Sequence, residues 1–118
     1  MTSELECLAA RLREFARVRE WERFHTPKNL AMALAGEVGE LVAEFQWLTA
    51  EESASPDQET LDRMRTELAD VTLYLVRLAD VLGVDLMAAA QAKLEDNDRR
   101  YDVERYRGSA RKAPPSGT

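Results

Sequence analysis

Residues 33–47 read A-L-A-G-E-V-G-E-L-V-A-E-F-Q-W, and this stretch decides the fold. Its apolar residues recur every three or four positions, which predicts one face of an amphipathic helix. At about 100° per residue, Glu37, Glu40 and Glu44 border the apolar face and do not lie opposite it. The stretch therefore predicts a helix that holds carboxylates at the edge of a hydrophobic contact.

Residues 66–76, T-E-L-A-D-V-T-L-Y-L-V, have the same layout. Glu67 and Asp70 are three residues apart, as Glu37 and Glu40 are, and they border a second apolar face. If the two faces pack together antiparallel, the four carboxylates converge. Such a cluster resists ionisation unless cations neutralise it, because like charges repel.

Oxygen ligands without histidine or cysteine favour Mg²⁺, or Mn²⁺ as a substitute, over zinc. A di-iron bundle would need Glu-x-x-His pairs on two helices, and the chain has a single histidine, His25. One Glu-x-x-Glu pair alone is more often a solvated surface feature, so the metal-site hypothesis depends on the second pair. Gly36 and Gly39 each cost about 1 kcal/mol relative to alanine in a helix, and close packing of a neighbouring helix explains them as well as a ligand does.

Proline, glycine and capping residues divide the chain into helices. We expect four amphipathic helices, over about residues 3–21, 27–50, 56–82 and 85–106. Thr26-Pro27 and Ser55-Pro56 are start signals for the second and third, with a polar loop over residues 51–57 between them. These elements predict an all-α four-helix bundle in a single domain, residues 1–107. Residues 108–118, G-S-A-R-K-A-P-P-S-G-T, are expected to form a disordered tail.

The composition excludes several classes of protein. The 118 residues include 16 basic and 22 acidic ones, and a net charge of −6 argues against a general binder of nucleic acid polymers. A single cysteine, Cys7, excludes an internal disulfide and fits a reducing cytoplasm. The first residues lack the apolar core of a signal peptide, and no apolar run approaches the roughly 20 residues that cross a bilayer. We therefore expect a cytoplasmic protein with no membrane partner.

The chain resembles the MazG-like superfamily of all-α nucleoside triphosphate pyrophosphohydrolases, and within it the dCTP pyrophosphatase group. The resemblance covers about residues 14–101 and includes W-E-R-F-H-T-P-K-N-L, G-E-V-G-E-L-V-A-E-F-Q-W, E-L-A-D-V-T-L-Y-L-V and K-L-E-D-N-D-R-R-Y. It implies hydrolysis of a nucleoside triphosphate to the monophosphate and pyrophosphate. It also implies a homo-oligomer, either a homotetramer built as a dimer of dimers or a homodimer, in which residues of the first helix close a neighbour's site.

The resemblance also assigns roles to the four acids. It implies that Glu37, Glu40, Glu67 and Asp70 hold Mg²⁺ ions that bridge the phosphates. It makes the three glutamates the catalytic residues, one of which takes the proton of the attacking water. The residues alone do not decide which glutamate that is.

Six further residues match substrate-contacting positions of the family: Trp21, Trp47, Tyr74, Lys93, Asn97 and Tyr101. The two tryptophans would enclose the base, since aromatic faces stack on nucleobases, although tryptophans also serve as core or interface residues. Tyr74 would lie near the sugar. Lys93 lies on a basic face of the fourth predicted helix, and without the resemblance that face would be interpreted as an ordinary charged surface. Members that prefer cytosine carry a histidine where this chain has Leu12, so dUTP, dTTP or a modified pyrimidine competes with dCTP as the expected substrate.

Two other functions fit the same residues. A non-catalytic helical module could use the acidic face to bind a partner, and it would not depend on divalent metal. Alternatively, the same fold could cleave another nucleotide, such as an alarmone or a nucleotide sugar. The expected role of the leading hypothesis is the removal of unwanted nucleotides from the pool that polymerases use.

Overall fold

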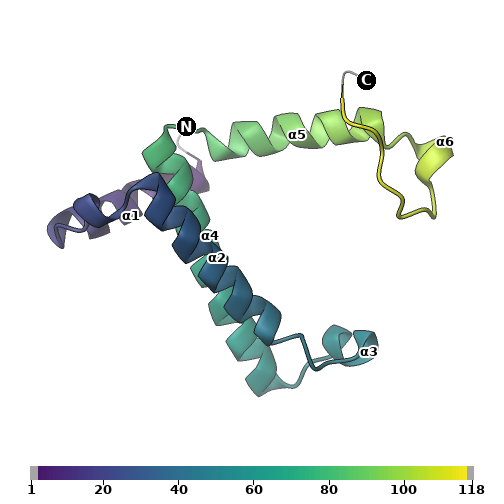
Figure 1. The fold of residues 1–118 in the computed structure, drawn as a ribbon, viewed down its shortest axis with the longest axis horizontal. Helices are drawn as coiled ribbons and strands as arrows, with labels where there is room; N and C mark the ends of the chain where they lie inside the picture. Colours follow the sequence, from purple (N-terminus) through teal and green to yellow (C-terminus); the bar gives the residue numbers. More distant parts are fainter. Residues whose placement is uncertain (1–2, 117–118) are drawn as a thin grey trace. The chain divides into compact units, whose positions relative to one another are not determined.

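The computed structural model describes residues 3–116, and these residues form helices joined by turns, with no strand among them (Figure 1). The helices, in chain order, are α1 (Glu4–Val18), the 3-10 helix η1 (Glu22–Phe24), α2 (Pro27–Ala43), α3 (Ala50–Ala54), α4 (Gln58–Leu82), α5 (Leu86–Arg100) and α6 (Val103–Tyr106). The predicted all-α class is confirmed. Over the same residues, none of the helices combines the length and the apolar sequence that a bilayer crossing requires.

Capping side chains explain where the helices of the site begin and end. The Thr26 hydroxyl accepts the Asn29 N–H at 3.2 Å, and Pro27 fills the first position of α2, as predicted. The α4 helix ends at Gly83, whose φ of 72° is left-handed and costs glycine little. The predicted start of this helix at Ser55-Pro56 is wrong, because the Asp57 carboxylate accepts the Thr60 N–H at 2.8 Å and starts the helix two residues later.

The chain between α2 and α4 also differs from the prediction. The α2 helix ends at Ala43, before residue 50, and the expected polar loop contains α3. The Thr49 hydroxyl accepts the Glu52 N–H at 3.1 Å, while the Glu52 carboxylate accepts the Thr49 N–H at 2.9 Å. This reciprocal capping box satisfies two backbone donors, so it favours a new helix over continuation of α2.

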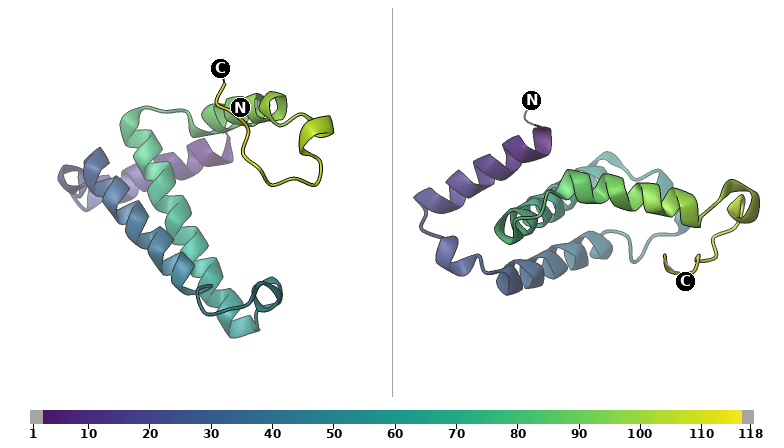
Figure 2. Two further views of the ribbon diagram at one scale, coloured as in Figure 1. Left: turned by 45° about the vertical axis from the view of Figure 1, so that its right-hand side comes forward. Right: turned by 90° about the horizontal axis from the view of Figure 1, so that it is seen from above.

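The chain divides after Val84 into two compact units. In the first, α2 and α4 lie side by side and antiparallel, and α1 packs on α4 (Figure 2). In the second, which contains α5 and α6, Arg100 donates to the carbonyl oxygens of Pro114 and Ala113 at 2.9 and 3.3 Å. The single domain over residues 1–107 and the disordered tail stay predictions.

The apolar face of α4 extends beyond what the chain itself covers. Val76 is buried although it lies outside the predicted apolar face, and Met64 is buried on that face, as the helical periodicity predicts. Leu68 and Leu82, on the same predicted face, are 54% and 56% exposed. The first unit therefore keeps a broad apolar surface, which is typical of an interaction site.

We expect Gly36→Ala to raise the free energy of unfolding by about 1 kcal/mol, because alanine is the better helix former. A Cβ at Gly36 or Gly39 would meet no described atom within 4 Å, so close packing within the chain does not explain either glycine. Chemical denaturation measures the change, and Gly83→Ala is the control, since its left-handed backbone makes that substitution destabilising. A destabilised Gly36→Ala would mean that a partner approaches α2 closely at this glycine.

Candidate metal centre and adjoining pocket

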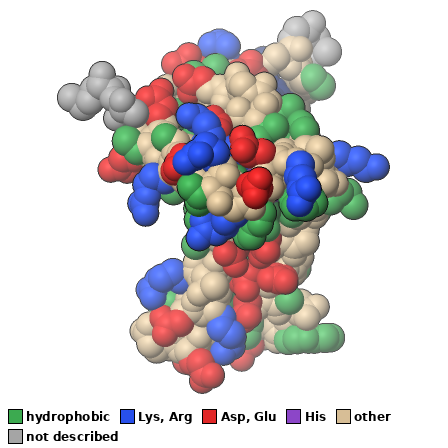
Figure 3. All heavy atoms as spheres, turned by 90° about the vertical axis from the view of Figure 1, so that its left-hand side faces the viewer, with side chains coloured by type: hydrophobic (Ala, Val, Ile, Leu, Met, Phe, Trp, Pro, Cys, Tyr) green, Lys and Arg blue, Asp and Glu red, His purple; other side chains and the backbone are tan. Residues whose placement is uncertain are grey.

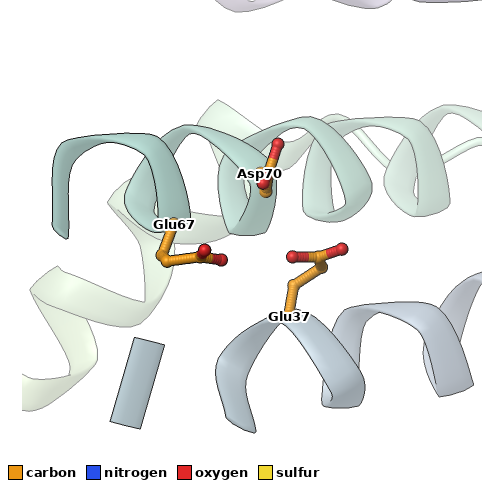
Figure 4. A group of neighbouring side chains, drawn as sticks. All are labelled: Glu37, Glu67 and Asp70. Carbon is orange, nitrogen blue, oxygen red and sulfur yellow. The ribbon is translucent and has the colours of Figure 1, made fainter. Parts of the chain in front are cut away.

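Three carboxylates meet between α2 and α4. Glu37 projects from α2, and Glu67 and Asp70 lie one turn apart on α4, where residues three apart share a face. One oxygen from each lies within 4.8 Å of the others. Figure 4 shows Glu37 and Glu67 extending toward one another from the facing helices. The antiparallel pairing thus brings together three of the four predicted metal ligands.

Two oxygen atoms of this cluster are enclosed without a partner. Oε2 of Glu37 and Oε2 of Glu67 have no hydrogen-bond donor among the described residues. Burying a carboxylate oxygen without a donor or a cation is unfavourable. A divalent cation bound by both oxygens would remove that cost, so the residues present fit the metal that the sequence predicts.

The environment of the cluster opposes ionisation. Partial burial is the main cause that raises the pKa of Glu37, and the charges of Glu40 and Asp70 raise it further. Burial also leads the causes that raise the pKa of Glu67, followed by the nearby carboxylate of Glu40. Glu40 is more exposed and lies at the margin of the cluster, close enough to act on both glutamates. The predicted mutual repulsion of the acids is therefore present.

The donor set is composed of carboxylate oxygens, which hard cations prefer. Acidic side chains form a band over the part of the surface that α2 and α4 occupy (Figure 3). Such a field attracts cations and repels bare phosphates. The site therefore suits Mg²⁺ or Mn²⁺, and a phosphorylated ligand would need that cation to approach.

We expect Mg²⁺ to raise the melting temperature, and to do so more strongly as the pH increases. The raised pKa values mean that the metal-free folded state holds protons more tightly than the unfolded chain does. The stability from these groups is therefore full at low pH, and it is lost as the pH rises from the usual glutamate range through the raised values. Mg²⁺ binds the ionised carboxylates, so its effect grows over the same window. Thermal unfolding in Mg²⁺ and in EDTA across this range measures both trends.

Glu67→Gln separates the metal effect from a general salt effect. It should raise the metal-free melting temperature at neutral pH, because one of the repelling charges is gone, and it should weaken the response to Mg²⁺. Glu95→Gln, at an exposed acid on α5, is the matched control and should respond as the unsubstituted protein does. An equal response to Mg²⁺ in Glu67→Gln would contradict a metal site at this cluster.

A pocket of about 190 Å³ adjoins the acidic cluster. Its walls are Leu12, Phe15, Trp21, His25, Asp70, Leu73, Tyr74 and Arg77. Asp70 belongs to both the cluster and the pocket, so the carboxylates lie at one side of this space. Trp21 packs edge-on against Phe15 at 5.6 Å and against His25 at 6.2 Å between ring centroids. Two predicted substrate contacts, Trp21 and Tyr74, thus share one cavity.

The other predicted substrate contacts are not among the residues that line this pocket. Trp47 follows the end of α2, is 86% exposed and does not line this pocket. Lys93, Asn97 and Tyr101 belong to the second unit, where Lys93 pairs with Asp96 at 3.6 Å. Asn97 and Tyr101 line a shallow hollow of that unit. Their grouping with the acids stays a prediction.

The sequence interpretation missed Arg77. Its guanidinium is buried in the pocket wall, where Nε donates to His25 Nδ1 at 3.1 Å and Nη1 donates to Asp80 Oδ2 at 3.4 Å. Asp80 also accepts two hydrogen bonds from Arg13, at 2.8 and 3.0 Å. Burial lowers the pKa of His25, and the charge of Arg77 lowers it further. The available signal was an arginine seven residues after Asp70, on the same helical face as the acids.

Antiparallel helices that place a cluster of carboxylates beside an aromatic pocket define an all-α protein with a candidate site for a divalent cation. The chain belongs to the MazG-like family, whose sequence profile matches residues 33–113. This membership confirms the resemblance that the sequence motifs indicate.

Curated relatives and a solved structure agree with the family. The chain is 48% identical over 99 residues to dCTP pyrophosphatase 1 of Bos taurus, covering 82% of this chain and 59% of that protein. It is 46% identical over 101 residues to dCTP pyrophosphatase 1 of Homo sapiens, and the alignment covers 84% of this chain and 59% of that protein. The chain thus spans about 59% of the length of these relatives. A crystal structure of a pyrophosphatase from Archaeoglobus fulgidus superposes with a TM-score of 0.79 at 37% identity, covering 86% of this chain and 95% of that one.

Proposed function

We propose that this protein hydrolyses a deoxynucleoside triphosphate to the monophosphate and pyrophosphate in a reaction that requires Mg²⁺. The observation that carries the proposal is the pair of enclosed, unpartnered oxygens of Glu37 and Glu67 next to an aromatic pocket. The similarity to proteins named dCTP pyrophosphatase 1 supports a pyrimidine deoxynucleotide as substrate. The biological role would be removal of unwanted nucleotides before a polymerase uses them.

Glu37, Glu40, Glu67 and Asp70 would hold the metal. When bound, Mg²⁺ supplies positive charge that offsets the charge of the phosphates and of the departing pyrophosphate. The water oxygen attacks the α-phosphorus, and the bond from that phosphorus to the pyrophosphate oxygen breaks. The water proton passes to a carboxylate oxygen of Glu37, Glu40 or Glu67.

The pocket would hold the base and the sugar. Trp21 offers an aromatic face for stacking, and Tyr74, one turn beyond Asp70 on α4, fills the space beside the sugar. Leu12 and Leu73 line the same space and make that part of its wall apolar. Lys93 and its neighbours on α5 remain proposed phosphate contacts.

The assembly and the compartment belong to the same proposal. The exposed apolar surface of α4 supports a homo-oligomer, a tetramer built as a dimer of dimers or a dimer. Assembly of this kind would let Trp47 reach the base of a bound nucleotide. The exposed thiol of Cys7 fits a reducing cytoplasm.

A substrate panel tests the activity directly. The purified protein is incubated with each deoxynucleoside triphosphate and Mg²⁺, and the products are resolved by chromatography. We expect monophosphate and pyrophosphate. Release of orthophosphate and a diphosphate would contradict the proposal, and so would no turnover of any nucleotide. If there is no turnover and the melting temperature does not respond to Mg²⁺, the helical interaction module is favoured.

Trp21→Ala is expected to raise KM about tenfold with a smaller change in kcat, because stacking of a base on an aromatic ring contributes about 1–3 kcal/mol. Steady-state kinetics on the best substrate of the panel measures the change. Phe24→Ala is the control, since Phe24 is exposed in the same segment and does not line the pocket. An unchanged KM in Trp21→Ala would remove Trp21 from the base site.

A further inference from the structure

Arg77 is a buried cation in the wall of a ligand pocket. It is 7% exposed, and its guanidinium is fixed on two sides, by His25 at 3.1 Å and by Asp80 at 3.4 Å. A guanidinium keeps its charge at any physiological pH and presents its donors in a rigid plane. The position of its remaining N–H groups is therefore set by the protein before any ligand arrives.

The remaining nitrogen, Nη2, is available to a ligand. It has no hydrogen-bond partner among residues 3–116, and it is not one of the enclosed unpartnered atoms, which are Oε2 of Glu37 and Oε2 of Glu67. Since Arg77 is otherwise buried and lines the pocket, we expect the accessible part of this nitrogen to face the pocket space. The wall thus offers at least one strong, charge-assisted donor.

The neighbouring side chains add a donor and no free acceptor. His25 Nδ1 accepts from Arg77, so the proton of the neutral ring lies on Nε2, which donates. Asp80 uses both carboxylate oxygens on Arg13 and Arg77. Asp70 belongs to the metal centre at the other side of the pocket. An amino group brought next to Arg77 and His25 would therefore meet donors, since the remaining acceptors of the wall, Asp70 and the Tyr74 hydroxyl, lie nearer the acidic cluster along α4.

The order of residues along α4 matches the order of parts in a nucleotide. Asp70, Tyr74 and Arg77 lie on one face at intervals of about one turn, so Arg77 is about 10 Å along the helix from Asp70. With the phosphates at the acidic cluster, the sugar falls beside Tyr74 and the base edge farthest from the sugar falls at Arg77. In a pyrimidine, that edge carries the substituent at position 4.

We propose that Arg77 determines base specificity by donating to a carbonyl oxygen at position 4, so that uracil or thymine is preferred to cytosine. The inference rests on the proposed function, because it requires the base of a nucleotide to occupy this pocket. The 4-oxygen of uracil accepts a hydrogen bond, whereas the 4-amino group of cytosine donates and would leave two donors opposed. Leu12 agrees with this choice, since an apolar wall offers cytosine no compensating acceptor.

The test compares base preference in variants of the full chain. We expect kcat/KM for dUTP to exceed that for dCTP by about tenfold or more, as a charge-assisted hydrogen bond allows. Arg77→Gln should reduce the ratio to about threefold or less, because an amide can donate or accept. Arg13→Gln, which also removes a partner of Asp80 but lies outside the pocket wall, should keep the ratio. A dCTP preference in the unsubstituted protein, or an unchanged ratio in Arg77→Gln, would overturn the proposal.

Two further measurements decide the proposal where the variant misfolds or the activity is absent. In the unsubstituted protein, the pyrimidin-2-one analogue of dUTP, which lacks the 4-oxygen, should lose about tenfold in kcat/KM, and an equal rate would overturn the role of Arg77. If no triphosphate is hydrolysed, the proposed function fails, and titration calorimetry with dUMP and dCMP then decides the role of Arg77. Tighter binding of dUMP supports it, whereas equal binding, or binding of neither, overturns it.

Discussion

Asp70→Asn is expected to lower kcat/KM for triphosphate hydrolysis by at least about 10²-fold while the protein stays folded, because stabilisation of charge by a metal site contributes several kcal/mol. The substitution keeps the shape of the side chain and removes its charge. Asp70 belongs to the carboxylate cluster and also lines the pocket, so under the proposed function it would connect the metal to the nucleotide. Steady-state kinetics in saturating Mg²⁺, with circular dichroism as the check on folding, measures the effect.

Asp62→Asn provides the matched control for Asp70→Asn. Asp62 is also on α4, but it is exposed, pairs with Arg65 at 3.0 Å and does not line the pocket. Its substitution should leave kcat/KM within about twofold, since an exposed ion pair contributes little. If Asp70→Asn kept more than one tenth of the activity, the metal site would have to be located elsewhere.

Asp80→Ala is expected to lower the free energy of unfolding by about 3 kcal/mol, because removal of one partner leaves a buried charge uncompensated. Asp80 accepts from Arg13 and from the buried Arg77, and these ion pairs depress the pKa of its carboxyl. Its stabilising contribution is therefore present above the usual aspartate range and is lost as the pH falls through the depressed value. Urea denaturation at neutral pH measures the loss.

The controls for Asp80→Ala use the same helix. Asp62→Ala removes an exposed i,i+3 ion pair and should cost less than about 1 kcal/mol. Asp80→Ala combined with Arg77→Met should recover part of the lost stability, because no charge is then left buried. A loss in Asp80→Ala no larger than in Asp62→Ala would show that solvent reaches Arg77 and that its charge needs no partner.

The elements that sequence could predict are those that local chemistry determines. The i,i+3 spacing of Glu67 and Asp70 places both on one face of a helix whatever surrounds them. The start of α2 at Thr26-Pro27 depends on hydrogen bonds within a single turn. An acidic cluster then followed from the antiparallel pairing of two similar helices, and the structure shows Glu37 in it.

The rest depends on contacts between distant residues. Arg77 pairs with His25, which is 52 residues away in the sequence, and Asp80 pairs with Arg13, which is 67 residues away. The periodicity of residues within α4 cannot reveal such partners. Local signals also compete, since α2 ends at Ala43 and a capping box at Thr49 starts α3, where the apolar pattern alone predicted one continuous helix. The exposed position of Trp47 could not be read from its aromatic character, since aromatic residues serve equally at cores, pockets and interfaces.

The two unpartnered glutamate oxygens lie on different helices, one on α2 and one on α4. An ion shared between them acts as a removable cross-link, and its departure leaves two helices that push each other away. Binding of the metal would then also stabilise the packing of α2 against α4. Under the proposed function, scarcity of free Mg²⁺ would loosen both the helix pair and the adjoining pocket that would receive the nucleotide.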